Sequence, residues 1–189
     1  MAITEKARRL SLAQRPIIGL SQGEPDFDTP AHICAADIEA MKEGKTRYTT
    51  VDGISELKEA ICAKFESEND VRYQPNQISV ATGGKQILYN ALMATVNEGD
   101  EVIISAPYWV SYPDIVLLCG GVPVIVTCGQ EQSFKLTAAD LAGAITPRTR
   151  WVILNSPSNP SGAAYTEKEI RQLAEVLNEN PHVLVMADD

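Results

Sequence analysis

The chain has 189 residues, of which 44% are hydrophobic and 22% are charged, a composition typical of a globular protein with one substantial core. Its formal net charge of -9 argues against nucleic acid and anionic membranes as partners, because both would repel it. No apolar run approaches the roughly 20 residues of a membrane span, and the N-terminus lacks the apolar core of a secretory signal. We therefore expect a cytoplasmic protein that acts on small molecules.

The first part of the chain predicts two helices separated by a strand and a loop. Apolar residues at helical spacing predict an amphipathic helix over 3–15, followed by a short strand over 17–20 and a loop over 21–30. Thr29-Pro30 fits the cap and first position of a second helix, which is expected to run to about residue 43.

From residue 55 onward, helices and short apolar strands alternate. Their spacing predicts helices at about 55–65, 86–96, 109–118 (broken near Pro113), 138–144 and 166–178, and strands at 77–81, 101–105, 122–127, 150–154 and 182–187. This alternation is typical of an α/β fold in which a mostly parallel sheet carries helices on both faces. The chain contains neither internal repeats nor low-complexity segments.

Residues with binding chemistry follow several of the predicted strands. They are Thr82-Gly83-Gly84-Lys85, Ala106-Pro107-Tyr108-Trp109, Asn155 to Asn159, and Asp188. Because ligands of parallel sheets collect at the carboxyl ends of the strands, we expect these segments to converge on one crevice.

The glycine pair and the tryptophan each allow two interpretations. Gly83 and Gly84 could let the backbone approach a phosphate at the start of a helix, or they could form a plain strand-to-helix turn. A Walker A loop is excluded, because Lys85 is followed by Gln86 rather than Ser or Thr. Trp109 could pack within its helix, or it could stack on a heteroaromatic ring at the mouth of the crevice.

Two polar residues near the C-terminus, Asn159 and Asp188, also allow two interpretations each. Pro160 and Gly162 fix a turn that could aim the Asn159 amide, or the segment could be a simple proline turn. Asp188 ends an apolar strand, where a carboxylate is either solvated at the sheet edge or paired with a cation, for example a protonated pyridine nitrogen.

The cysteines and histidines indicate no metal site. The four cysteines form no CxxC pair and have no metal-ligand spacing with His32 or His182. We interpret the cysteines as small apolar residues.

Taken in order, seven motifs resemble the bacterial branch of the aspartate aminotransferase family of class I and II pyridoxal-phosphate (PLP) aminotransferases. The motifs are Gly23-Glu24-Pro25-Asp26-Phe27-Asp28-Thr29-Pro30, Lys45-Thr46-Arg47-Tyr48, Gly53-Ile54-Ser55-Glu56-Leu57, Gly83-Gly84-Lys85-Gln86, Pro107-Tyr108-Trp109-Val110-Ser111-Tyr112, Ile145-Thr146-Pro147-Arg148-Thr149 and Asn155-Ser156-Pro157-Ser158-Asn159-Pro160-Ser161-Gly162. Each motif is weak alone, but their shared order is specific and covers essentially the whole chain.

The resemblance implies a role for each matching residue. Gly83, Gly84 and Lys85 would hold the PLP phosphate through main-chain N–H groups, and Tyr48 would reach the phosphate in a neighbouring subunit of a homodimer. Trp109 would stack on the pyridine ring.

The remaining implied roles concern the ring substituents and the substrate. Asn159 would bind the ring hydroxyl, and Gly23, Trp109 and Asn159 would contact the substrate, an amino acid or a 2-oxo acid. Asp188 would keep the pyridine nitrogen protonated.

The resemblance also implies residues that this chain does not contain. Family members carry the Schiff-base lysine, a tyrosine and a carboxylate-binding arginine downstream of the strand that ends in Asp188. We therefore expect the first part of a larger polypeptide, with no catalytic residue of its own and no activity by itself. Residues 1–30 would belong to the small domain, and residues 31–189 would form the first, truncated part of the large PLP-binding domain.

Three interpretations follow for the function. The parent protein is a transaminase, with aspartate and 2-oxoglutarate as the favoured substrates and aromatic amino acids, alanine or prephenate as alternatives. The second is a non-catalytic truncated protein that acts through association with a partner. The third is an unrelated nucleotide-binding α/β domain.

Overall fold

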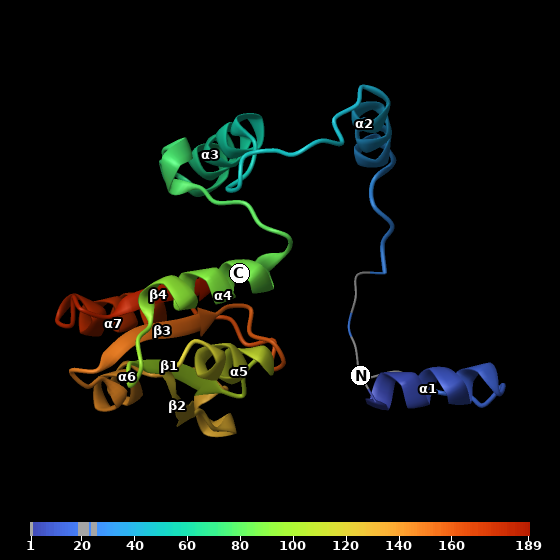
Figure 1. The fold of residues 1–189 in the computed structure, drawn as a ribbon. Coiled ribbons are helices and arrows are strands. Elements are labelled where there is room, and N and C mark those ends of the chain that lie inside the picture. The colour runs from blue at the N-terminus through green and yellow to red at the C-terminus, as the bar shows by residue number, and fades with distance from the viewer. Residues whose placement is uncertain (1, 19–22, 24–25) are drawn as a thin grey trace. The chain divides into compact units, whose positions relative to one another are not determined.

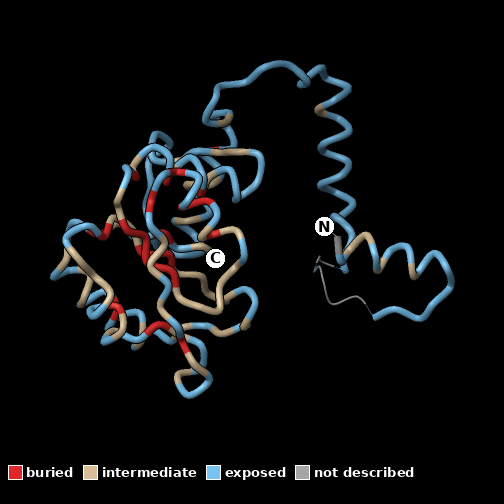
Figure 2. The backbone as a smooth tube through the Cα atoms, turned by 60° about the horizontal axis from the view of Figure 1, so that its bottom comes forward, coloured by how far each residue is buried: buried red, intermediate tan, exposed pale blue. Residues whose placement is uncertain are grey.

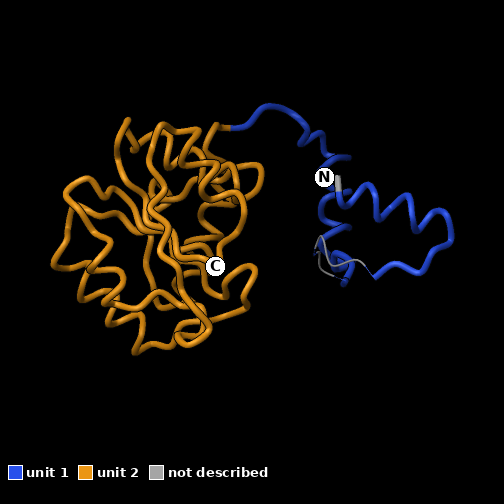
Figure 3. The backbone as a smooth tube through the Cα atoms, turned by 90° about the horizontal axis from the view of Figure 1, so that it is seen from below, with its two compact units in different colours: residues 1–49 blue, residues 50–189 orange. Residues whose placement is uncertain are grey.

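The computed structural model describes residues 2–18, 23 and 26–189, which form two compact units, residues 1–49 and residues 50–189 (Figure 3). The first unit contains helices α1 (Ala2–Leu12) and α2 (Ala31–Lys42). Glu5 of α1 forms ion pairs with Arg8 and Arg9 at 3.0 and 2.9 Å. Such exposed pairs add little stability.

The second unit is an α/β domain (Figure 1). In chain order its elements are α3 (Ser55–Asn69), η1 (Pro75–Gln77), α4 (Gly84–Thr95), β1 (Glu101–Ala106), α5 (Ser111–Leu118), β2 (Val122–Thr127), η2 (Gln130–Gln132), α6 (Ala138–Ala144), β3 (Thr149–Asn155), α7 (Glu167–Asn178) and β4 (Leu184–Asp188). The four strands are all parallel, in the order β2-β1-β3-β4.

Two apolar clusters lie on opposite faces of this sheet, because successive strand residues point to opposite sides. Val102 and Ile104 of β1 belong to one cluster, together with α4 and α5. Ile103, between them, belongs to the other cluster, together with α6 and α7. Figure 2 shows the buried residues gathered in this unit. The predicted parallel sheet with helices on both faces is therefore confirmed.

The predicted strand over 77–81 is wrong. Gln77 ends the short helix η1, and no strand of the described chain pairs with residues 78–81. Ile78 has an extended backbone (φ -106°, ψ 132°), and the Val80 N–H donates to the Asp52 carbonyl at 3.0 Å. The apolar pattern thus predicted extended backbone correctly, but a strand also needs a partner.

Smaller differences concern the ends of elements. Helix α5 begins at Ser111 rather than 109, and Pro113 lies in its first turn, where the missing N–H costs nothing because that group has no partner within the helix. Strand β4 begins at Leu184 and includes Asp188. The strand predicted over 17–20 is absent at 17 and 18, and residues 19 and 20 lie outside the described residues.

Among the helices that the structure describes, none combines the length and apolar character that crossing a membrane requires.

Candidate active site

A cavity of about 300 Å³ lies at the carboxyl ends of β3 and β4, beside the N-terminus of α4. The chain leaves β1 toward β2 on one side and then returns to β3 on the other, so the switch point, where ligands of parallel sheets bind, lies between the carboxyl ends of β1 and β3. The cavity adjoins this point, since Trp109 follows β1 and Asn155 ends β3. The cavity is lined by Gly84, Lys85, Leu88, Trp109, Tyr112, Asn155, Asn159 and Asp188.

The glycine turn forms the helical end of the cavity. Gly83 precedes α4 with φ 85°, a left-handed conformation that disfavours any side chain. A Cβ at Gly83 or Gly84 would meet nothing within 4 Å, so the backbone is open to a ligand. The Thr82 N–H donates to the Gln86 side chain at 2.9 Å, and the Gln86 N–H donates to the Gly83 carbonyl at 3.2 Å. The Gly83 N–H donates to the Ala81 carbonyl at 2.9 Å, whereas the N–H groups of Gly84 and Lys85, the first two residues of α4, have no partner within the helix.

Trp109 is held from two sides. Its ring meets Tyr112 edge to face, with centroids 5.3 Å apart and planes at 76°. The Lys85 ammonium lies 4.8 Å from the centroid of the Trp109 ring. This cation–π contact places a positive charge within the cavity, where it would attract an anionic ligand.

Asp188 and Tyr112 also line the cavity, and they contact each other. The Tyr112 hydroxyl donates a hydrogen bond to the Asp188 carboxylate. Burial, and then the neighbouring carboxylate, raise the pKa of Tyr112 above its ordinary value. Tyr112 therefore remains a protonated donor at neutral pH and holds the carboxylate toward the cavity.

Asn155 connects Asp188 with the loop that follows β3. Asn155 and Asp188 are paired in the sheet register, and the Asn155 amide donates to the Asp188 backbone carbonyl at 2.7 Å. The side-chain oxygen of Asn155 accepts the Asn159 N–H at 2.7 Å. One side chain thus fixes Asn159 relative to Asp188.

The structure brings together five of the predicted site residues, namely Gly84, Lys85, Trp109, Asn159 and Asp188. Gly83 caps α4 and, in the described part of the chain, does not itself line the cavity. Tyr48 and Gly23 are exposed residues of the unit formed by residues 1–49. The proposed roles of all these residues remain predictions.

Three lining residues, Leu88, Tyr112 and Asn155, were not assigned a role from the sequence. Asn155 was expected at the crevice, because it follows an apolar strand, but the sequence assigned it no specific task. Tyr112 has no such signal, because its contact with Asp188 spans 76 residues.

Comparison with known proteins identifies the family. A family model described as aminotransferase class I and II matches residues 15–189. The chain belongs to the class I and II aminotransferases. This membership excludes the unrelated nucleotide-binding domain, and it confirms the resemblance and the aminotransferase-like fold.

Individual relatives agree with this family assignment. The aspartate/prephenate aminotransferase of Cereibacter sphaeroides (strain ATCC 17029 / ATH 2.4.9) is 63% identical over 100% of this chain and 47% of its own length. The crystal structure of the aspartate aminotransferase from Rhizobium meliloti has a TM-score of 0.95 and 53% identity, covering 100% of this chain and 47% of that one. Aspartate aminotransferase from Thermus thermophilus with maleate has a TM-score of 0.94 and 41% identity, covering 98% and 48%. The chain spans about half the length of the curated relatives it matches.

Aminotransferases of this class depend in general on PLP, and the cavity of this family member has a donor set that fits that cofactor. Open N–H groups at the start of α4 suit a phosphate, the Trp109 indole suits a flat ring, and the Asp188 carboxylate suits a pyridinium nitrogen. Among the described residues, no three His, Cys, Asp or Glu side chains gather as a metal site.

Proposed function

We propose that this chain supplies the cofactor-binding part of a PLP-dependent transaminase that exchanges an amino group between an amino acid and a 2-oxo acid. The observation that carries the proposal is the convergence of the Gly84 turn, Trp109, Asn159 and Asp188 on one cavity at the sheet's switch point. Family membership supplies the reaction class.

The family resemblance assigns a task to each residue. Gly83, Gly84 and Lys85 bind the phosphate through main-chain N–H groups, and Trp109 covers one face of the pyridine ring. Asn159 donates to the ring hydroxyl oxygen and, with Gly23, helps to bind the substrate.

Asp188 keeps the pyridine nitrogen protonated, and Tyr112 holds Asp188 in place. Bound there, PLP supplies an electron-poor ring that accepts the electrons left when the amino acid loses its α-proton. The chain's own contribution is therefore to bind, to orient and to keep one proton on the ring nitrogen.

The favoured substrates are aspartate and 2-oxoglutarate, with prephenate as a second amino acceptor. Relatives at 63, 58 and 55% identity are named as aspartate/prephenate aminotransferases or probable ones, which supports aspartate and prephenate. The choice of 2-oxoglutarate rests on the family resemblance. The Lys85 ammonium gives the cavity a cation suited to an anionic ligand.

We also propose the wider organisation that the family implies. Residues 1–30 belong to the small domain and residues 31–189 to the large domain of a cytoplasmic homodimer, in which Tyr48 serves the neighbouring active site. These 189 residues are expected to be inactive by themselves, because the resemblance assigns the Schiff-base lysine to none of their lysines.

The test is transaminase activity of the natural-length protein that contains this chain. With PLP and aspartate, it should convert 2-oxoglutarate to glutamate, and the same assay with prephenate measures the second acceptor. Absence of transfer from aspartate to both acceptors would refute the assignment of aspartate. Absence of transfer from aromatic amino acids and alanine as well would refute the transaminase and favour a non-catalytic protein.

The chain itself gives a second test. Incubation with PLP and borohydride, followed by peptide mapping, should leave no lysine labelled in stoichiometric amount. Stoichiometric labelling of Lys85 would contradict the assignment of this residue to the phosphate turn.

A further inference from the structure

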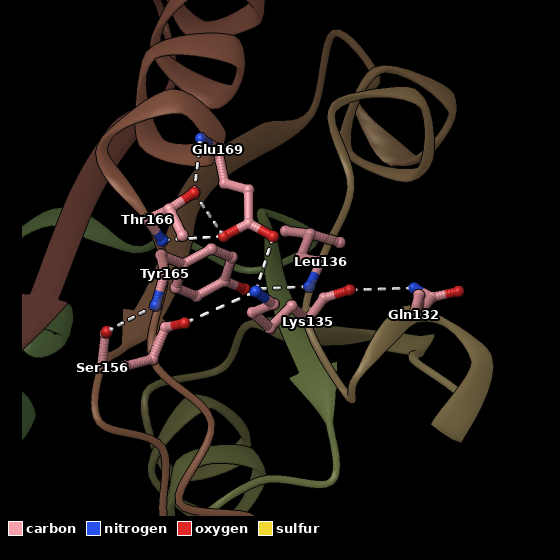
Figure 4. Close-up of polar contacts among 8 residues, drawn as sticks. Gln132, Lys135, Leu136, Ser156, Tyr165, Thr166 and Glu169 are labelled. Atoms are coloured by element: carbon pink, nitrogen blue, oxygen red, sulfur yellow. Dashed lines mark hydrogen bonds and ion pairs between the residues drawn. The ribbon is translucent and has the colours of Figure 1, made fainter.

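The loop over 156–165, which carries Asn159 to the cavity, is connected at its far end to a segment distant in sequence. Figure 4 shows the contacts between residues 132–136 and the start of α7. We call the side chains of Lys135, Tyr165 and Glu169 the loop brace. None of the three lines the cavity among the described residues.

The first part of the loop brace is an ion pair. The Lys135 ammonium lies 2.6 Å from Glu169 and 3.5 Å from the carbonyl of Ala164, in the loop. The Lys135 side chain is only 17% exposed, so the pair is better shielded from solvent than a typical surface pair. The Lys135 ammonium, followed by the Thr166 N–H and hydroxyl, lowers the pKa of Glu169 to about 2.

Glu169 divides its two oxygens between two tasks. Oε1 faces Lys135, while Oε2 accepts the N–H and hydroxyl of Thr166 at 2.7 and 2.8 Å in the capping box of α7. The helix start and the 132–136 segment are therefore joined through one carboxylate.

The second part of the loop brace is the Tyr165 phenol. Its oxygen accepts the Leu136 N–H at 2.9 Å, and Leu136 is only 2% exposed. The Tyr165 N–H donates to the Ser156 hydroxyl at 3.2 Å, which joins the end of the loop to its beginning. Tyr165 also packs against the apolar cluster of α6 and α7.

Between these ends the loop is closed on itself. The Ser158 N–H donates to the Ala163 carbonyl at 2.8 Å, and the Gly162 N–H donates to the Ser158 carbonyl at 2.7 Å. The Asn159 N–H is held by Asn155 at the cavity side. A displacement at Ala164 or Tyr165 is therefore transmitted through a short hydrogen-bonded turn to Asn159.

We propose that Tyr165 and Lys135 are positioning residues that act on the cavity through Asn159. The proposal rests on the proposed function, in which Asn159 contacts cofactor and substrate. Without the loop brace, the 156–165 turn loses its hydrogen bonds to the 132–136 segment, and the Asn159 amide samples more orientations.

The first experiment measures hydrogen exchange in the natural-length protein without cofactor. Tyr165→Phe removes only the hydroxyl, and Lys135→Met removes only the charge. In both variants we expect the Ser158, Asn159 and Gly162 amides to exchange at least about tenfold faster, because a local opening that needs about 1.4 kcal/mol less free energy is tenfold more populated. Lys135→Arg should restore the protection, since the cation is retained.

Matched controls carry the same chemical changes at exposed positions. Tyr73→Phe and Lys168→Met should leave the three amides unchanged, because Tyr73 is 40% exposed and Lys168 is exposed on α7. Unchanged exchange in Lys135→Met would overturn the proposal, even if Tyr165→Phe failed to fold. Because this readout needs no turnover, it stands or falls independently of transaminase activity.

The second experiment is a double-mutant cycle on PLP affinity, measured by equilibrium dialysis. Tyr165→Phe should raise the PLP dissociation constant about two- to tenfold when Asn159 is present, and by less than about 1.5-fold in an Asn159→Ala background, since coupled residues are not additive. Equal factors in both backgrounds would mean that Tyr165 acts on general stability alone, which would overturn its role through Asn159.

Discussion

Replacing Tyr112 with Phe tests how the Asp188 carboxylate is held. The Tyr112 side chain is 3% exposed, and its hydroxyl donates to that carboxylate. The hydrogen bonds donated by Asn155 and Ser156 reach the backbone carbonyl of Asp188 instead. Phe keeps the edge-to-face contact with Trp109, so the change removes one charged hydrogen bond and little packing.

The expected magnitude follows from this contact. A hydrogen bond to a charged group contributes about 1.5–3 kcal/mol to stability, and the half-buried position of Asp188 places the loss within that range. For the natural-length protein, the proposed function predicts that a carboxylate that samples more orientations slows α-proton removal by roughly tenfold for each 1.4 kcal/mol lost in the transition state.

The pH dependence has a definite sign. Because burial and Asp188 raise the pKa of Tyr112 above its ordinary value of 10.0, the folded state disfavours the phenolate. The hydrogen bond is therefore complete below about pH 10, and its contribution falls only above that pH. The difference in unfolding free energy between the wild type and Tyr112→Phe should be constant from neutral pH to about pH 9 and smaller above about pH 10.

Urea unfolding over this pH range and single-turnover kinetics are the assays. Tyr73→Phe is the control, since its ring is exposed and packs edge-on against Phe65. An unfolding free energy for Tyr112→Phe within about 0.5 kcal/mol of the wild type would refute the reasoning, because surface substitutions typically produce changes of that size.

Three further predictions concern other sites. Asp188→Ala should slow α-proton removal far more than Asp189→Ala, because Asp188 lines the cavity and Asp189 is exposed. Equal losses of rate in single-turnover kinetics, with PLP still bound, would mean that Asp188 is not the partner of the pyridine nitrogen. Glu169→Gln should destabilise the protein at pH 7, and by less as the pH falls below about 4.5 toward 2. Because the pKa of Glu169 is lowered in the folded state, its carboxylate stabilises the protein fully above the ordinary pKa of 4.5, and this effect is lost as the carboxylate is protonated. An equal loss of unfolding free energy at pH 7 and pH 3, measured by urea unfolding, would contradict this. Gly53→Ala should lower the melting temperature more than Gly99→Ala. Both glycines have positive φ, but only a Cβ at Gly53 would lie 2.7 Å from the Val80 Cβ. Equal melting temperatures of the two variants would show that Val80 moves aside without cost.

The sheet could be predicted from the sequence because its strands are buried apolar runs. Val102, Ile103 and Ile104 are all at most 1% exposed, as expected for a strand covered on both faces. The segment 78–81 has the same apolar character, yet it pairs with no described strand. Strand pairing depends on a neighbour, and a local pattern does not specify one.

The candidate site could be predicted where a site residue is marked by its near neighbours in the sequence. Asp188 ends strand β4, so the rule for parallel sheets locates it. The glycine turn follows no strand and is located instead by its place at the start of helix α4. The hydrogen bond from Tyr112 to Asp188 joins residues 76 apart, and the one from Leu136 to Tyr165 joins residues 29 apart. Such contacts come from the packing of helices on the sheet, which no spacing rule contains.

The cavity depends on both faces of the sheet. Trp109 and Tyr112 pack with the cluster of α4 and α5, whereas Tyr165, at the end of the Asn159 loop, packs with the cluster of α6 and α7. Since Ile103 and Ile104 are adjacent in β1 but face different clusters, neighbouring core substitutions should disturb different walls of the cavity. A change beneath Trp109 should alter the support of Asp188, while a change beneath Tyr165 should alter the position of Asn159. The central strands therefore connect two independently packed layers to a single site.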